Sequence, residues 1–402
     1  MKKINHLISA LIMAAMTAGF ASCSSSDEPS SVSDNTPKEL TLTIMSTKPV
    51  TKAALTTIPT DAEKTINRIT IGIFSQDGNT VRTIQEFSDG TASSADETAG
   101  TNKFYNPTNG SATVKVVTTQ LDPNDQVLVA INAPAGKFNG ILNAQNFKDV
   151  TINAETAIAT DASNSTSQNI AQPQNIPMFG EVTSLSGAGN SYSAHVDVYH
   201  LTAKITLSSL KVAFDTSGPY ADASFTPTEI FLYSVPDGLK FNYSSPYLTS
   251  PTTYYTGETG ATGTLTFKGF LSSESLSASA LNNSSPNFGT PYYFYTTPNN
   301  DVNANKTKLV IKGQFQKNST DQGTTVYYPV SLNHKVEANG STGAANSSLN
   351  EYQVYPNKDY QCSVTIKTIG SSGPSVDIDP TTATIDITVK DWDVVNQTTV
   401  FQ

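Results

Sequence analysis

Short runs in which apolar and polar residues strictly alternate recur along most of this 402-residue chain. The clearest runs are residues 40–44, 69–73 and 383–389, where every second residue is apolar. A period of two places those apolar side chains on one face of a β-strand. Turn residues such as Asp77-Gly78 close several of the runs and are typical of hairpins. The sequence therefore predicts an all-β protein built from β-sandwich domains, with little helix.

The spacing of the runs predicts two domains. We expect an N-terminal sandwich at residues 53–210 and a C-terminal sandwich at 211–402, because strand-like runs continue on both sides of this region. One short helix is expected at 137–149, residues 50–64 are expected to be a loop, and residues 89–109 form a long polar segment between the expected strands. The other strands are expected at residues 114–117, 127–132, 192–199, 201–207, 229–233, 264–267, 292–296, 308–315, 325–332 and 359–369.

The charge balance excludes one class of partner. Charged residues make up only 14% of the chain, and the net charge is −10. The chain has no cluster of basic residues beyond Lys2 and Lys3. Nucleic-acid binding requires a cationic surface, so we expect no nucleic-acid partner.

The first 23 residues have the organisation of a bacterial lipoprotein signal. Lys2 and Lys3 precede an apolar stretch at 7–20, and small residues lead to Cys23. The apolar stretch is too short to remain as a membrane-spanning helix. We expect residues 1–22 to be removed and the Cys23 thiol to carry palmitate, which would make the precursor an outer-membrane lipoprotein. The alternative is an ordinary secretory signal followed by an unrelated cysteine.

Residues with catalytic or metal-binding potential do not form a recognisable constellation. Ser208 and Lys211 match the S-x-x-K pattern, but Ser208 follows a predicted strand, whereas the serine nucleophile of that pattern opens a helix. His195 and His200 are five residues apart, which places them on opposite faces of a strand. Cys362 is expected to be a small buried hydrophobic residue. We therefore expect a protein that is not an enzyme and that binds neither metal nor cofactor.

The order of several motifs resembles the fimbrillin family, in particular the major fimbrial stalk subunit of Bacteroidales type V pili. No single motif is diagnostic, and the resemblance runs nearly from end to end. The motifs are the lipoprotein signal and residues 51–53, 69–74, 126–132, 176–178, 201–205, 325–330, 355–360 and 389–392.

The resemblance implies two tandem transthyretin-like β-sandwich domains and a route of assembly. Cleavage after a basic residue, here between Lys52 and Ala53, would release residues 23–52 as a propeptide. Known members carry Arg at that place, so Lys52 departs from the pattern, and Arg68 is a second possible site. The released part includes the lipidated tether and a removable first strand, whose apolar residues are Leu40, Leu42 and Ile44.

The resemblance also implies that a neighbouring subunit fills the vacated groove with its C-terminal strand. We expect residues 394–402 to be that donor strand, with its apolar side chains filling pockets in the groove. The candidate pocket-filling residues are Val394, Val395, Val400 and Phe401. The alternative is that this run pairs as the last strand of its own domain, and the register of donation stays open.

These observations predict a structural subunit of a cell-surface fimbrium, with a role in adhesion or biofilm formation. Its partners would be copies of itself, accessory fimbrial subunits, a processing protease and, before cleavage, the outer membrane. The alternative function is a monomeric surface-anchored lipoprotein that binds carbohydrate or protein.

Overall fold

The computed structural model describes residues 36–46, 62–158, 175–244, 253–262, 265, 266, 276, 278–289, 292–377 and 382–391. Strands dominate these residues, as the alternating runs predict. The helices are short: α1 (Ala144–Lys148), α2 (Ala154–Ala157) and the 3-10 turns η1 (Ala62–Lys64) and η2 (Asp96–Thr98). Within the described ranges, no helix has the length and apolar character needed to cross a membrane.

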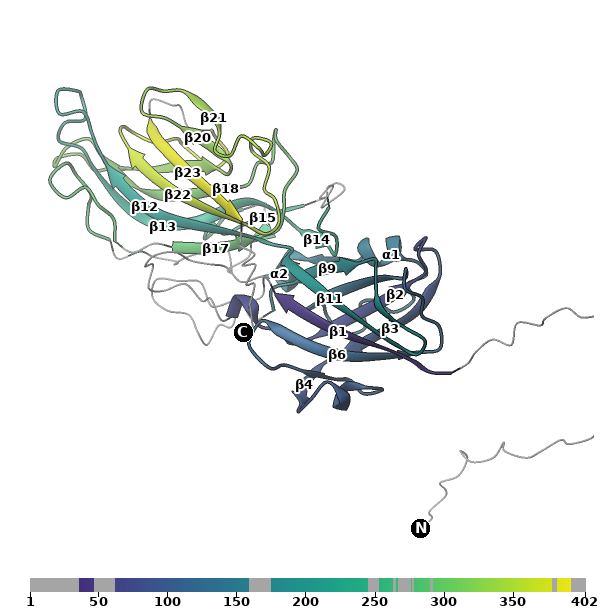
Figure 1. Ribbon diagram of the computed structural model, residues 1–402. Helices are drawn as coiled ribbons and strands as arrows, with labels where there is room; N and C mark the ends of the chain where they lie inside the picture. The colour runs from purple at the N-terminus through teal and green to yellow at the C-terminus, as the bar shows by residue number, and fades with distance from the viewer. Residues whose placement is uncertain are drawn as a thin grey trace, which may run out of the picture. The chain divides into compact units, whose positions relative to one another are not determined.

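The first half of the chain forms one ten-stranded sheet, in the order β3-β2-β7-β9-β11-β1-β6-β5-β4, with β10 paired to β11 (Figure 1). Its strands are β1 (Lys38–Ser46), β2 (Ile69–Phe74), β3 (Val81–Phe87), β4 (Asp89–Ala92), β5 (Lys103–Tyr105), β6 (Ser111–Thr118), β7 (Gln126–Ile131), β9 (Met178–Val182), β10 (Ser186–Ala188) and β11 (Ser191–His200).

The second half forms a six-stranded sheet, β17-β12-β22-β23-β20-β21, and a five-stranded sheet, β16-β15-β13-β18-β19. The small β8 (Thr151–Asn153) pairs with β14 (Gly238–Lys240). The remaining strands are β12 (Ala203–Val212), β13 (Ser224–Pro236), β15 (Tyr254–Thr256), β16 (Leu265–Thr266), β17 (Tyr292–Thr296), β18 (Lys308–Gln316), β19 (Thr324–Ser331), β20 (His334–Val336), β21 (Thr342–Ala344), β22 (Lys358–Ile366) and β23 (Ala383–Asp391).

The ten-stranded sheet encloses its own apolar core. Strand β6 alternates strictly between buried and half-buried residues, and β1 has the same alternation over most of its length. Their inward side chains pack with those of β2, β7 and β11 in one cluster of buried residues. The apolar members of β1 in this cluster are Leu40, Leu42 and Ile44.

Strands β2 and β7 are buried on both faces, because a second core covers their other side. Phe74 of β2 packs edge-on against Phe147 of α1, with ring centroids 5.9 Å apart. Phe147 stacks on Phe138 at 4.1 Å, and Phe138 meets Phe241 at 5.3 Å. This second core continues without a break into the strands of the second half.

Several expectations are confirmed and others need correction. The strands expected at 114–117, 292–296 and 308–315 are present as β6, β17 and β18. The helix expected at 137–149 is only α1, because Gly140 has a φ of 76° and Asn143 caps the helix by accepting from the backbone N–H of Asn146. The polar segment 89–109, where no strand is expected, contains β4, η2 and β5.

The passage between the two halves lies at residues 201 and 202, between β11 and β12. The boundary expected between residues 210 and 211 lies inside β12. Ser208 and Lys211 also lie in β12, so Ser208 does not open a helix. Cys362 is fully buried in β22, and burial raises the pKa of its thiol, as expected of a small hydrophobic residue.

Candidate functional site

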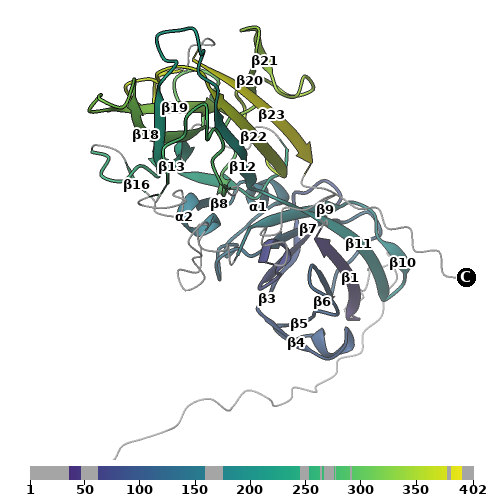
Figure 2. The same ribbon diagram turned by 90° about the vertical axis from the view of Figure 1, so that its left-hand side faces the viewer.

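Strand β1 lies in the interior of the ten-stranded sheet, between β11 and β6 (Figures 1 and 2). It runs parallel to β11, with Leu40 opposite Tyr192 and Ser46 opposite Val198. It runs antiparallel to β6, where Leu42 is opposite Val114. Both edges of β1 are therefore occupied along nearly its whole length.

Both ends of β1 are held by further hydrogen bonds. The backbone N–H of Glu39 donates to the carbonyl of Asn190 at 2.8 Å, and that of Ser46 donates to Gly110 at 2.7 Å. The Lys38 ammonium donates to the carbonyl of Leu121 at 3.2 Å. These bonds extend the strand ladder to its two ends.

The two faces of β1 differ sharply in burial. Leu40, Leu42 and Ile44 are 0% exposed, whereas Met45 on the opposite face is 45% exposed. Burying a side chain of this size contributes about 1.5–3 kcal/mol, so the three together contribute about 5–9 kcal/mol before entropic costs. The strand thus contributes a large part of the apolar core of the ten-stranded sheet, although it belongs to the first segment of the described chain.

The position of β1 in the strand order also makes it the link between two parts of the sheet. In the ladder of the described strands, β1 joins β6, β5 and β4 to β11 and the rest of the sheet. Taking β1 away would expose the hydrogen-bonding edges of β6 and β11 together with the apolar floor beneath them. An exposed groove of this kind binds extended peptides by adding a strand.

A buried charge network holds the chain just downstream of β1. Glu63 in η1 is 1% exposed, and its Oε1 accepts hydrogen bonds from Lys204 Nζ and from the Tyr295 hydroxyl, both at 2.5 Å. The backbone carbonyl of Glu63 lies 2.8 Å from His200 Nε2, and His200 Nδ1 lies 3.4 Å from Asn357 Oδ1. Residues 62–64 are thereby tied to β11, β12 and β17.

The protonation of this network follows from its burial. Burial lowers the pKa of His200, so the imidazole is neutral at pH 7. Burial and the nearby Glu63 carboxylate raise the pKa of Tyr295 well above its ordinary value, so its hydroxyl stays a donor. Burial also raises the pKa of Asp359, which lies near Lys204. At neutral pH the His200 imidazole is therefore uncharged and the Tyr295 hydroxyl keeps its proton.

Solved structures share this architecture. A candidate cell adhesion protein from Parabacteroides distasonis aligns over 90% of this chain and 98% of its own, with a TM-score of 0.59 and 15% identity. The fimbrillin of Porphyromonas gingivalis W83 aligns over 90% of this chain and 99% of its own, with a TM-score of 0.55 and 16% identity. This chain has the fimbrillin fold.

A third structure with the fimbrillin fold, a candidate cell adhesion protein from Bacteroides eggerthii, aligns over 89% of this chain and 98% of its own, with a TM-score of 0.55 and 20% identity. No protein-family model and no curated protein matches the sequence. The likeness is therefore one of three-dimensional structure rather than of sequence.

The candidate residues from the sequence fall into two groups. Leu40, Leu42 and Ile44 lie together on the inward face of β1. All the others lie outside the described residues: Cys23, Lys52, Ala53, Val394, Val395, Val400 and Phe401. His195 is exposed and His200 is buried, on opposite faces of β11, as their spacing predicts.

The sequence did not reveal the network around Glu63. Lys204 lies in the expected strand 201–207, but the sequence alone does not show that its side chain is buried and therefore needs a partner. The partner Glu63 is 141 positions away in the sequence, in a segment that was expected to be a loop. No local pattern could have connected the two residues.

Proposed function

We propose that this protein is the stalk subunit of a cell-surface fimbrium, polymerised by strand exchange. The proposal includes export as a lipoprotein acylated at Cys23, and cleavage between Lys52 and Ala53. It also includes two tandem transthyretin-like sandwiches. The role is structural and adhesive rather than catalytic.

The observation that carries the proposal is the position of β1 between β6 and β11, with three fully buried side chains. Cleavage at Lys52 would cut the covalent link between β1 and the rest of the domain. The groove left by β1 would offer two strand edges and an apolar floor, which is the chemistry of strand addition. The fimbrillin fold supports this reading, since one solved structure that shares it is a fimbrillin.

The network around Glu63 supports Lys52 rather than Arg68 as the cleavage site. Residues 62–64 are held by buried contacts, and Arg68 forms an ion pair with Glu86 directly before β2. Proteases bind extended backbone, so a cut within held structure is disfavoured. Cleavage after Lys52 would leave the Glu63 contacts in place and release only the segment before them.

We further propose that residues 394–402 leave their own subunit after β23 and fill the groove of a neighbour. Val394, Val395, Val400 and Phe401 would supply the apolar side chains that replace those of β1. A stalk subunit needs both a releasable strand and a donor strand, and the sequence offers both. Its partners would be copies of itself and accessory fimbrial subunits at the cell surface.

Proteolytic activation of the purified precursor tests this function. Limited digestion with a lysine-specific protease, followed by N-terminal sequencing and negative-stain electron microscopy, should give a chain starting at Ala53 and filaments. The matched control is Lys52→Gln, which should remain uncut at this position and monomeric. A monomeric protein after clean removal of residues 23–52 would contradict the proposal and favour a monomeric surface-anchored binding protein.

A further inference from the structure

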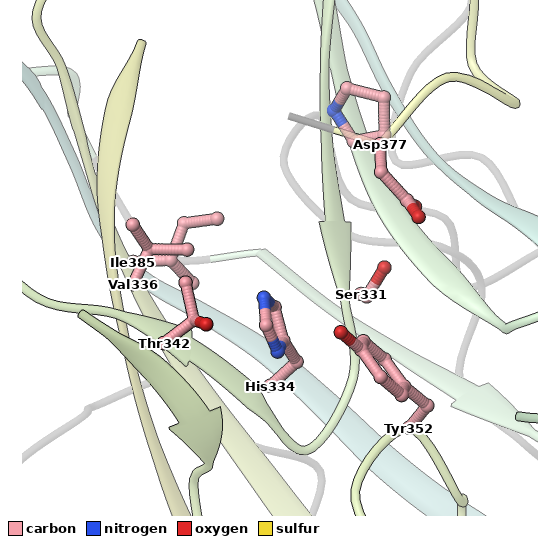
Figure 3. A pocket seen from close by; sticks show the side chains of 8 residues that line it. Ser331, His334, Val336, Thr342, Tyr352, Asp377 and Ile385 are labelled. Atoms are coloured by element: carbon pink, nitrogen blue, oxygen red, sulfur yellow. The ribbon is translucent and has the colours of Figure 1, made fainter. Parts of the chain in front are cut away.

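A small pocket opens between the two sheets of the second half of the chain, far in sequence from β1. Its volume is about 200 Å³. Strand β19 supplies Pro329 and Ser331, and the facing sheet supplies His334, Val336, Thr342 and Ile385; Tyr352 and Asp377 complete it (Figure 3). Pockets for drug-sized ligands have about 300–1,000 Å³, so this one suits a smaller molecule.

The pocket combines an apolar wall with converging polar groups. Pro329, Val336 and Ile385 form the apolar part of the lining. Figure 3 shows the Ser331 hydroxyl lying between the Asp377 carboxylate and the Tyr352 hydroxyl, with the His334 imidazole beside them. A few polar groups set against an apolar surface are the usual means of orienting a small ligand.

The backbone of Tyr352 is held in an unfavourable conformation. Its φ is 68°, in the left-handed region that a bulky residue rarely adopts. The ring stacks on His334 with centroids 4.7 Å apart, and Lys306 Nζ lies 3.9 Å from the ring centre. Strain of this kind persists only where surrounding contacts enforce it, and it is concentrated at functional sites.

Hydrogen bonds near Tyr352 hold its backbone in this conformation. Asn333, fully buried next to His334, donates through Nδ2 to the carbonyl of Asn350 at 2.8 Å. Its Oδ1 accepts from the backbone N–H of Asn346 at 3.0 Å. These two bonds fix the segment that leads into Tyr352 against the end of β19, so the pocket is rigidly built.

The charges around the pocket limit what it can bind. Asp377 accepts from Lys308 at 2.7 Å and from Lys306 at 3.0 Å. Burial opposes ionisation, but these two lysines lower the pKa of Asp377, so the carboxylate is charged at neutral pH. Two lysines already pair with the carboxylate, so it offers a cationic ligand little attraction, and it repels an anionic ligand. An apolar ligand would cover the Ser331 and Thr342 hydroxyls without offering either of them a hydrogen bond.

We propose that this pocket binds one neutral sugar residue. A pyranose ring offers hydroxyl donors to the Asp377 carboxylate, further hydroxyls to Ser331 and Thr342, and C–H groups to the apolar wall. The sugar is either a free monosaccharide or the terminal residue of a surface glycan, and the methyl glycosides used below distinguish the two. This proposal concerns a site separate from β1 and holds whether or not the chain polymerises.

Isothermal calorimetry or ligand-observed NMR on the purified full chain tests it. The probes are D-glucose, D-galactose, D-mannose and N-acetyl-D-glucosamine, each as the free sugar and as its methyl glycoside, with sodium phosphate as an anionic comparison. At least one sugar should bind at millimolar concentration, and phosphate should not compete. Binding of the methyl glycoside identifies a terminal glycan residue as the ligand, and binding of the free sugar alone identifies a monosaccharide.

Three variants locate the binding. Asp377→Asn and Ser331→Ala should each weaken it, the first at least tenfold. Tyr352→Gly should abolish binding while keeping or raising the midpoint of thermal unfolding, because glycine relieves the strained φ. The matched control is His195→Gln on β11, which should bind as the parent does. If no sugar binds, if phosphate binds instead, or if all three folded variants keep full affinity, the proposal is wrong.

Discussion

The ammonium of Lys204 lies 2.5 Å from a carboxylate oxygen of Glu63, and both side chains are almost completely buried. Lys204 belongs to β12 of the six-stranded sheet, and Glu63 belongs to the turn η1 that precedes β2 of the ten-stranded sheet. The pair thus ties the turn at residues 62–64 to the second half of the protein. The proposed cut after Lys52 leaves this tie intact.

Removing the charge of Glu63 should destabilise the protein strongly. Glu63→Gln keeps the shape of the side chain but leaves the Lys204 ammonium without its counter-charge in a buried site. Breaking one partner of a buried pair costs about 3–5 kcal/mol. Urea unfolding followed by fluorescence measures this. The control is Glu97→Gln, which breaks an exposed pair with Lys103 and should leave the unfolding midpoint unchanged; equal midpoints for both variants would contradict the assignment.

His200 should make the stability depend on pH below neutrality. Its pKa in the folded protein is lowered from the ordinary 6.5 by burial. The unfolded chain therefore binds a proton more readily, so this stabilisation is complete above pH 6.5 and is lost as the pH falls through the folded pKa. The pKa of Asp359 is raised in the folded protein, so this group makes the folded state more stable as the pH falls. Its effect is complete once the pH has fallen to its ordinary pKa of 3.8.

Thermal unfolding between pH 8 and pH 5 measures this dependence. The midpoint of the parent protein should fall as the pH drops below 6.5. His200→Gln should show a smaller fall over the same range, even if its midpoint at pH 8 is lower. The exposed His195, changed to Gln, should leave the dependence as it is. A parent and a His200 variant with the same dependence would show that another group is responsible.

A substitution in the buried face of β1 should destabilise the precursor and leave the stability of the proposed processed subunit unchanged. Leu42→Ala creates a cavity in the core and should lower the free energy of unfolding of the precursor by about 2–5 kcal/mol. Thr43→Ala, on the exposed side of the same strand, serves as control. Filaments assembled from either variant should dissociate like those of the parent, since the proposed cleavage removes β1 from them. Weaker filaments from Leu42→Ala would mean that β1 is retained.

The local pattern of the sequence was enough for most strands. Alternation at Leu40, Leu42 and Ile44 predicts β1 because strand geometry itself has a period of two. Strands β4 and β5 were missed, because they have four and three residues and lack an alternating apolar face. The helix was expected to span 137–149 because that segment carries Phe138, Ile141, Leu142 and Phe147. Phe138 is buried, but it lies before a turn at Gly140 rather than in helix α1.

Partners distant in sequence could not be predicted from any local pattern. The parallel pairing of β1 with β11 joins Leu40 to Tyr192, and the ion pair joins Glu63 to Lys204. Both depend on how distant parts of the chain pack together rather than on the residues beside them. The pocket at Tyr352 was missed for the same reason, since its lining comes from β19, β20, β21 and β23.

The lipid anchor gives a prediction for the start of the proposed route. Cys23→Ala should abolish labelling of the precursor with a radioactive or clickable palmitate, because the thiol is the proposed acceptor. It should also reduce the number of fimbriae on the cell surface. Cys362→Ala is the control, since the buried thiol of Cys362 is inaccessible to acylation. Labelling that persists in the Cys23 variant would show that the anchor lies elsewhere.

The most direct test of strand exchange is electron microscopy of a subunit that lacks residues 394–402. After cleavage at Lys52, the parent protein should form filaments, and the truncated protein should remain a folded monomer with an unchanged far-ultraviolet circular dichroism spectrum. Filaments from the truncated protein would contradict donation by this strand. An unfolded truncated protein would also contradict it, because the strand would then belong to the core of its own domain.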